Sequence, residues 1–171
     1  MICAPFLIPY NGRIARFLSK SYIKNSQKNI EKINDIGHNL SNHVILCGYG
    51  RSGQFLGRFL KEEHIPFIAI DMDLNRVNDA SNAGELVMYG DASRRVVLNA
   101  AGIKNCKAVI ITYADDRASS KVLTVVRETY LDLPVIVRTA DESSIALLQK
   151  EGATEVVPEV LEGSLMLSLI H

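Results

Sequence analysis

The chain has 171 residues, of which 47% are hydrophobic, so it is long enough for one sizeable core and too short for two ordinary domains. Its formal net charge is zero, which argues against a dedicated nucleic-acid binder. The three cysteines share no close spacing, which favours a reducing compartment, and the four histidines form no ligand-spaced pair, so a metal site has little support.

The first 42 residues differ from the rest of the chain in charge and pattern. They hold six Lys or Arg and two Asp or Glu, a net of +4, so the remainder carries −4. Residues 1–10 are apolar but far shorter than the ~20 residues that span a bilayer. Bases follow from Arg13 onward, as they do at the cytoplasmic exit of a transmembrane helix, although an apolar terminus before a surface helix also fits. We expect residues 1–42 to be a membrane-exit remnant and a basic helical linker.

The most informative stretch runs from His43 to Gly53. A short apolar run, Val44–Cys47, is predicted to be a strand; it breaks into Gly48-Tyr-Gly-Arg-Ser-Gly53, and a helical pattern of apolar residues follows at once. This order of strand, glycine turn and helix is the context in which G-x-G-x-x-G binds a nucleotide. Gly48 permits the tight turn, Gly50 lets a pyrophosphate approach the backbone, and Gly53 lets the helix pack close to the strand. The start of the helix then offers unpaired N–H groups to the phosphates.

A second apolar strand, 66–71, ends in an acid. Asp71 follows Gly53 by 18 positions, close to the offset of about 20 expected for the acid that binds the adenosine ribose. An acid at this place repels a 2′-phosphate, so NADP should be disfavoured. A simple strand-end acid is the alternative for Asp71, whereas Asp73 is expected to cap the next helix.

The same rhythm continues to the end of the domain. Further strands are predicted at 86–89, 107–112, 134–138 and 154–157, with helices opening at Gly90 and running to Asn99, opening at Asp115 and Asp116, and covering 143–150. Apolar runs that alternate with amphipathic helices indicate an α/β fold with a parallel sheet covered on both faces. We predict a Rossmann-like, doubly wound, six-stranded sheet of order 3-2-1-4-5-6 over residues 43–158.

The last segment, 159–171, carries Leu161, Leu165 and Leu169 at helical spacing. Such a C-terminal helix could pack on a partner subunit, continue into further sequence, or pack on the same domain. We expect it to form a dimer contact.

A nucleotide that is bound but not turned over fits these residues best. The predicted nucleotide domain accounts for most of the chain, and no Ser-His-Asp, Cys-His, P-loop or H-E-x-x-H arrangement is found beside it. The chain is therefore predicted not to be an enzyme, and its ligand would act as a signal. The alternatives are a small NAD-dependent oxidoreductase, or a subunit of one, and an interaction module that has lost its nucleotide. The intact glycines and Asp71 argue against the latter.

From His43 onward the chain resembles the N-terminal RCK domain, also called the KTN or TrkA-N domain. The motifs that carry the resemblance are Gly48-Tyr-Gly-Arg-Ser-Gly-Gln54, Asp71-Met-Asp73, Tyr89-Gly-Asp-Ala-Ser93 and 157–165. The closer resemblance is to the cytoplasmic regulatory domain of Kef-type monovalent cation:proton antiporters, because Cys3–Tyr10 and the bases after it look like the end of their last membrane helix.

This resemblance implies a ligand-sensing domain at the cytoplasmic face of the bacterial inner membrane. It would bind NAD(H) or an adenine nucleotide such as AMP or ATP, and would gate potassium transport by a membrane transport domain. It further implies a homodimer, and a chain that is a fragment of a longer transporter.

The resemblance also assigns roles to individual residues. The predicted cofactor-binding set is Gly48, Gly50, Arg51, Ser52, Gly53, Asp71, Met72, Asp91, Ala92, Thr112 and Arg138. Arg51 would reach a phosphate, Asp91 and Ala92 would lie near the adenine, and Thr112 would lie near the other half of the ligand. Kef-type domains also sense glutathione or its adducts. Arg138 matches one basic position of that site, but Ala140 stands where a second arginine is expected, so glutathione is not assigned as a ligand.

Overall fold

A computed structural model describes Asp35 and residues 39–159 of the chain. They form one parallel six-stranded sheet of order β3-β2-β1-β4-β5-β6, so the predicted fold class and strand order are confirmed. The strands are β1 (Val44–Cys47), β2 (Phe67–Asp71), β3 (Val87–Tyr89), β4 (Ala108–Ile111), β5 (Val135–Thr139) and β6 (Glu155–Pro158).

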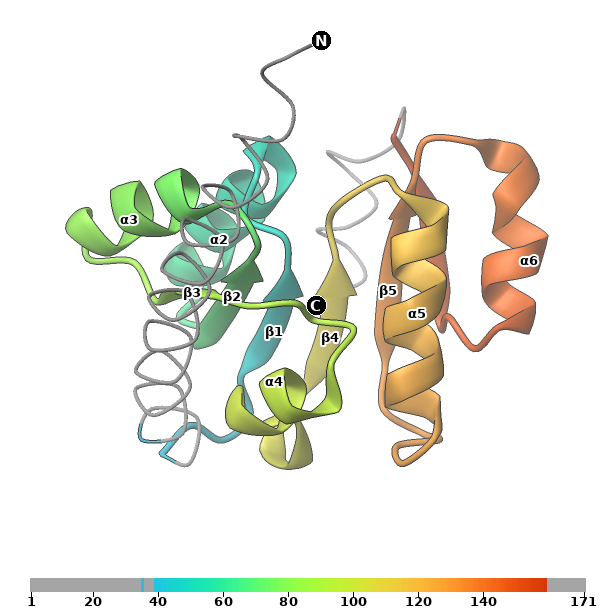
Figure 1. Cartoon of the computed structure of the whole chain (residues 1–171), viewed down its shortest axis with the longest axis horizontal. Coiled ribbons are helices and arrows are strands. Elements are labelled where there is room, and N and C mark those ends of the chain that lie inside the picture. Colours follow the sequence, from blue (N-terminus) through green and yellow to red (C-terminus); the bar gives the residue numbers. More distant parts are fainter. Residues whose placement is uncertain (1–34, 36–38, 160–171) are drawn as a thin grey trace, which may run out of the picture.

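Helices lie on both faces of this sheet (Figure 1). The α-helices are α2 (Arg51–Glu62), α3 (Leu74–Asn82), α4 (Arg95–Ala100), α5 (Asp116–Arg127) and α6 (Ile145–Lys150), and the 3-10 helices are η1 (Ile103–Asn105) and η2 (Glu142–Ser144). Apolar residues of α2 and α3 share one core cluster, and those of α4, α5 and α6 share the other. The two clusters are separated by the sheet.

The central strand β1 shows why a continuous apolar run was needed. Val44 and Leu46 belong to the cluster under α2 and α3, whereas Ile45 and Cys47 belong to the cluster under α4 and α5. All four residues are at most 1% exposed. Because successive side chains of a strand point to opposite faces, a strand covered on both faces must be apolar throughout. Burial raises the pKa of the Cys47 thiol to about 12, so it packs as a neutral, small apolar group.

The predicted helix over 90–99 was placed too early, because α4 begins only at Arg95. The carboxylate of Asp91 accepts hydrogen bonds from the Ser93 N–H at 2.9 Å and from the Ser93 hydroxyl at 2.7 Å. Such a local side-chain bond offers the backbone an alternative to a helical turn. The residues after β3 therefore form a turn beside the sheet edge, and the other predicted elements differ from the observed ones by a few residues at most.

Arg127, at the end of α5, holds the opposite edge of the sheet together. Its Nε donates to the Gly152 carbonyl at 2.8 Å, and its Nη1 donates to the carbonyls of Tyr130 at 2.7 Å and Leu133 at 2.8 Å. Burial lowers the pKa of Arg127. Because these acceptors belong to the backbone, this guanidinium is a fixed part of the fold.

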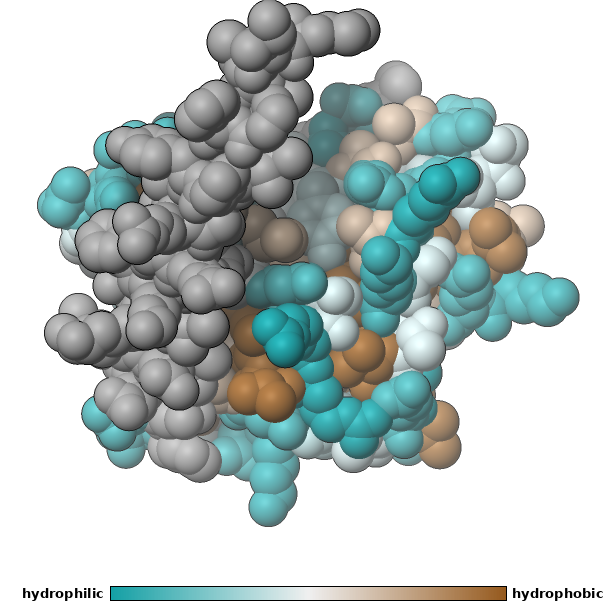
Figure 2. Space-filling model, in the orientation of Figure 1, coloured by the Kyte–Doolittle hydropathy of each residue, from teal (hydrophilic) through white to brown (hydrophobic). Residues whose placement is uncertain are grey.

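The predictions for the linker and for the C-terminal helix concern residues 1–34, 36–38 and 160–171, which lie outside the described residues. Among the described helices, none is both long enough and apolar enough to cross a membrane. The coloured surface in Figure 2 is largely hydrophilic, with separate apolar patches, one of them over α4. Single exposed apolar residues, such as Val96 on α4 at 61%, are ordinary on a protein surface.

Candidate functional site

A cavity of about 990 Å³ opens at the carboxyl ends of the strands, between the start of α2 and the start of α5. Open parallel sheets bind ligands at this edge, where the strand order reverses between β1 and β4. The volume is at the upper end of the range for small-molecule and cofactor sites.

The structure brings the whole predicted set together around this cavity. Gly48, Gly50, Arg51, Ser52, Gly53, Asp71, Met72, Asp91, Ala92, Thr112 and Arg138 all line it. They come from the ends of several strands that lie far apart in sequence. Their common location is a property of the fold, and their individual roles toward a ligand stay predictions.

The glycine turn has the geometry that its sequence predicts. Gly48 adopts a φ of +100°, which L side chains rarely adopt, and its N–H donates to the Ile70 carbonyl at 2.8 Å. A Cβ on Gly53 would lie only 2.3 Å from the Gly48 carbonyl oxygen, so the first turn of α2 packs directly on the turn. Gly50 has open space beside it, because the nearest atom to its ideal Cβ is Nη1 of Arg76 at 3.6 Å.

The N-terminus of α2 has no side-chain cap among the residues that the structure describes. Its N-cap residue is Gly50, which has no side chain to make a capping hydrogen bond. The first N–H groups of a helix have no partner within the helix and carry a partial positive charge. They therefore point into the cavity as an anion-binding end that is ready for a phosphate.

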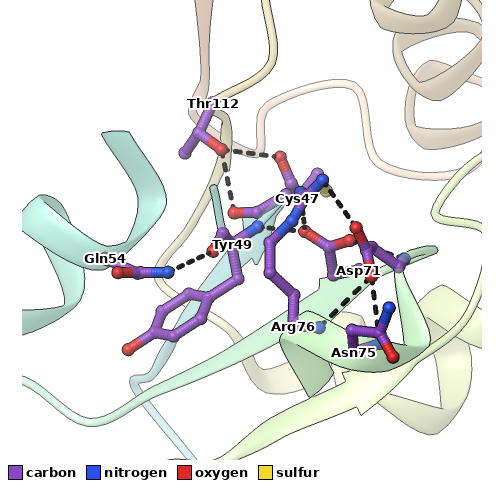
Figure 3. Close-up of polar contacts among 9 residues, drawn as sticks. Cys47, Tyr49, Gln54, Asp71, Asn75, Arg76 and Thr112 are labelled. Atoms are coloured by element: carbon purple, nitrogen blue, oxygen red, sulfur yellow. Dashed lines mark hydrogen bonds and ion pairs between the residues drawn. The ribbon is translucent and has the colours of Figure 1, made fainter. Parts of the chain in front are cut away.

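Thr112 ties this turn to the second half of the sheet. Its hydroxyl lies 2.8 Å from the Gly48 carbonyl oxygen and 3.1 Å from the Cys47 carbonyl oxygen, to which it donates a shared hydrogen bond. Figure 3 shows the hydroxyl turned toward these carbonyls. Thr112 is therefore a support of the turn, and a direct contact with a ligand stays a prediction.

Asp71 lies directly beside the turn, at the end of β2, and lines the same cavity. Its Oδ2 accepts hydrogen bonds from the Tyr49 N–H at 2.6 Å and from Nη1 of Arg76 at 2.9 Å, and its Oδ1 accepts one from the Asp73 N–H at 2.8 Å (Figure 3). The residue is 5% exposed. The carboxylate is thus buried, paired with a cation and fixed in direction, as a residue that orients a ribose should be.

The far end of the cavity is also charged. Arg138 donates through Nη1 to the Thr112 carbonyl at 3.2 Å and through Nη2 to Glu159 at 2.6 Å. Lys121 of α5 lines the same end and, like Arg51 near the turn, makes no ion pair with the described residues. These two side chains can reach toward an anionic ligand without first breaking an ion pair in the described part of the chain.

Other lining residues were not assigned to the ligand from the sequence. They are Ile70, Asp73, Arg76, Gly90, Ser93, Tyr113, Ala114, Asp115, Ala118, Lys121 and Glu159. Position directly after a predicted strand was the only available signal, and it would have found Gly90 and Tyr113. Burial, followed by the neighbouring Cys47, Asp91 and Asp115, raises the pKa of Tyr113, so its phenol stays protonated and can donate a hydrogen bond.

Comparison with known proteins agrees with the fold and the motifs. The sequence pattern of the TrkA-N domain matches residues 44–159. The chain is 40% identical over 169 residues to a protein named as the K(+) efflux antiporter KefB, from Alkalimonas amylolytica, which covers 98% of this chain. It spans only 26% of that relative's length.

Two solved structures share the fold. The TrkA-N domain of the inner membrane protein ybaL from Escherichia coli has a TM-score of 0.68 and 27% identity, and the match covers 78% of this chain and 99% of that one. The Kef CTD of Shewanella denitrificans in its AMP-bound form has a TM-score of 0.62 and 26% identity, over 75% of this chain and 78% of that one. On the match over residues 44–159, the chain belongs to the TrkA-N domain family.

Proposed function

We propose that this chain is a ligand-sensing regulatory domain that binds an adenine nucleotide at the carboxyl edge of its sheet and controls potassium transport by a cation:proton antiporter. The observation that carries the proposal is that the start of α2, where Gly50 offers no capping side chain, and a buried acid, Asp71, line the same cavity. The first would hold the phosphates and the second the ribose of an adenosine nucleotide.

The relatives support the ligand and the role. The Kef domain of Shewanella denitrificans was solved with AMP, and the relative from Alkalimonas amylolytica is named as a K(+) efflux antiporter. AMP and NAD(H), which both carry an adenosine ribose and phosphate groups, are the ligands proposed here. Within the proposal, the partner is a membrane transport domain, the domain works as a homodimer, and its place is the cytoplasmic face of the membrane.

The side chains that line the cavity favour ligand sensing over catalysis. Among the described residues, the side chains beside the glycine turn are committed to the fold: Thr112 to the turn, and Asp71 to backbone N–H groups and Arg76. A regulatory site needs ligand affinity that differs between two conformations of the protein, and it needs no proton donor.

Isothermal titration of the chain with AMP, ATP, NAD and NADH tests the proposal. We expect saturable binding of at least one of them, and an Asp71→Asn change should weaken that ligand by about tenfold or more, because hydrogen bonds to a charged acceptor are lost. Glu62→Gln, at the far end of α2, removes the same charge from an exposed site outside the cavity and should leave the affinity unchanged. Binding of none of the four ligands, or steady oxidation of NADH, would contradict the proposal.

Control of transport requires a longer protein. This chain can replace the matching quarter of the Alkalimonas amylolytica antiporter, and potassium efflux can then be measured in cells. We expect the Asp71→Asn chimera to differ from the unmodified chimera in its efflux rate. If the two chimeras had equal efflux rates although the Asp71→Asn chain no longer bound nucleotide in vitro, nucleotide binding would not control transport, and the regulatory part of the proposal would be wrong.

A further inference from the structure

The carboxylate of Asp71 is already engaged before any ribose reaches it. In the described part of the chain it receives three hydrogen bonds, two at Oδ2 from the Tyr49 N–H and Arg76, and one at Oδ1 from the Asp73 N–H. A carboxylate offers about four lone-pair positions, two on each oxygen. Both positions on Oδ2 are taken, and one remains on Oδ1.

Arg76 is the one of these three donors that can leave. The Tyr49 and Asp73 donors are backbone N–H groups fixed by the turn after β1 and by the start of α3. Arg76 donates from a long side chain that is 44% exposed. It differs in this respect from Arg127, whose Nε and Nη1 donate to backbone carbonyls.

A ribose cis-diol binds a carboxylate best when each hydroxyl donates to a different oxygen. Two such bonds require a free position on Oδ2 as well as on Oδ1, and only the departure of the guanidinium provides it. Resting on the proposed function, we infer that Arg76 is an internal competitor for Asp71, which the ribose diol must displace. It is then an affinity-setting residue, because the strength of its ion pair is subtracted from the binding of the nucleotide.

After displacement, the Arg76 guanidinium can pair with other acidic side chains close to α3. Its Nη2 already lies 3.2 Å from Asp73 Oδ2. Arg76 also lines a second cavity of about 260 Å³, together with Asp79, Glu85 and Arg58. Asp79 is one helical turn further along α3, and Oε2 of Glu85 is buried without a hydrogen-bond partner among the described residues.

Arg76 is placed so that the ribose diol can displace its guanidinium from Asp71 without a movement of the backbone. Its Nη1 is the atom nearest to the open side of Gly50, where a phosphate would approach the turn. The guanidinium thus stands between the proposed phosphate and ribose positions and moves by a side-chain rotation alone, with α3 and Asp71 staying in place.

The inference is tested by titrating Arg76→Met with AMP and with 2′-deoxy-AMP. Methionine keeps the length of the side chain but cannot donate a hydrogen bond, so AMP should bind about threefold to fivefold more tightly, as expected for loss of a half-exposed ion pair. 2′-Deoxy-AMP lacks the diol and can use the free position on Oδ1, so its affinity should change less than twofold.

Two further variants separate competition from charge and from folding. Arg58→Met removes the same charge from the second cavity without touching Asp71, and it should alter both ligands equally. Arg76→Lys keeps a cation that can pair with Asp71, and its AMP affinity should return toward that of the unchanged chain. Circular dichroism melts establish that each variant is folded.

Weaker AMP binding by Arg76→Met, or an equal change for AMP and 2′-deoxy-AMP, would overturn the inference and make Arg76 a support of Asp71. A crystal structure with AMP in which the ribose contacts Asp71 and the 2.9 Å pair persists would overturn it as well. Failure of the unchanged chain to bind AMP, ATP, NAD or NADH would instead remove the proposed function on which it rests.

Discussion

The helices α2 and α3 begin at the same edge of the sheet, after the neighbouring strands β1 and β2. They differ in whether a side chain caps the free N–H groups of the first turn. At α3, the Asp73 side chain accepts hydrogen bonds from the N–H groups of Asn75 at 3.0 Å and Arg76 at 3.2 Å. At α2, the N-cap is Gly50, which has no side chain to offer.

This difference leads us to expect that an anionic ligand binds at one of two similar helix N-termini and not at the other. Both helix starts attract negative charge, because both present unpaired N–H groups. At α3 the chain fills this place with its own carboxylate, whereas at α2 no side chain of the described residues does so. A nucleotide phosphate should therefore bind at α2, and each of the following predictions tests whether this contrast holds.

The largest effect is expected from Gly53→Ala in the first turn of α2. An added Cβ would lie 2.3 Å from the Gly48 carbonyl oxygen, so the helix and the turn would have to separate. We expect a loss of about 3 kcal/mol in the free energy of unfolding, as for overpacking against an unyielding neighbour. Urea denaturation followed by circular dichroism measures it.

Gly84→Ala is the matched control for this change. Gly84 has a φ of +80°, but nothing lies within 4 Å of its ideal Cβ, so alanine there costs only the backbone strain, about 1 kcal/mol. If Gly53→Ala costs no more than Gly84→Ala, then the close packing of α2 on the turn is not what stabilises this end of the helix.

Gly50→Ala should separate binding from folding. The new methyl group would meet only Nη1 of Arg76, at an ordinary 3.6 Å, and the φ of Gly50 is −69°, so the free energy of unfolding should change by about 0.5 kcal/mol or less. The methyl group would nevertheless stand where a phosphate approaches the backbone, so titration calorimetry should show AMP affinity about tenfold lower. Unchanged affinity would place the phosphate elsewhere.

Asp73→Ala should have the smallest effect, because it removes a cap from an exposed helix start. We expect the melting temperature at pH 7 to fall by about 2 to 4 °C. Asp73→Asn retains a good capping side chain and should fall less. Calorimetric melts of the two variants and the unchanged chain measure these differences.

The effect of Asp73→Ala should also depend on pH. The hydrogen bond from the Arg76 N–H is the main cause of a lowered pKa of Asp73 in the folded chain. A carboxylate with a lowered pKa stabilises the fold above its unfolded pKa, and this contribution is lost as the pH falls through the folded pKa. The difference in melting temperature should therefore shrink below about pH 4. A constant difference down to pH 3 would show that the charge of Asp73 is not what caps α3.

The sheet could be predicted from sequence because a strand buried on both faces leaves an uninterrupted apolar run. Val44–Cys47 is predicted and observed with the same bounds. The start of α4 could not be predicted in this way. The same residues, Gly90–Ser93, satisfy a helical pattern in the sequence, but the bonds of Asp91 to Ser93 hold them in a turn.

The candidate site could be predicted where a sequence motif fixes the backbone conformation and the spacing of the residues. The glycines of the turn and the strand-end acid Asp71 have a fixed offset in sequence, and the fold brings them to one cavity. The contact of Arg76 with Asp71 had no such signal. A basic residue in the first turn of a helix is usually exposed, and only the path of α3 after β2 directs this one toward Asp71.

The free N–H groups at the start of α2 also bear on how ligand binding should depend on pH. The positive end of a helix is made of peptide groups, and these do not gain or lose a proton near neutral pH. Its attraction for a phosphate should therefore persist until the phosphate itself is protonated, with a second pKa of about 6. A sensor that relies on this end of α2 would follow the concentration of its nucleotide and stay largely indifferent to changes of acidity around neutrality.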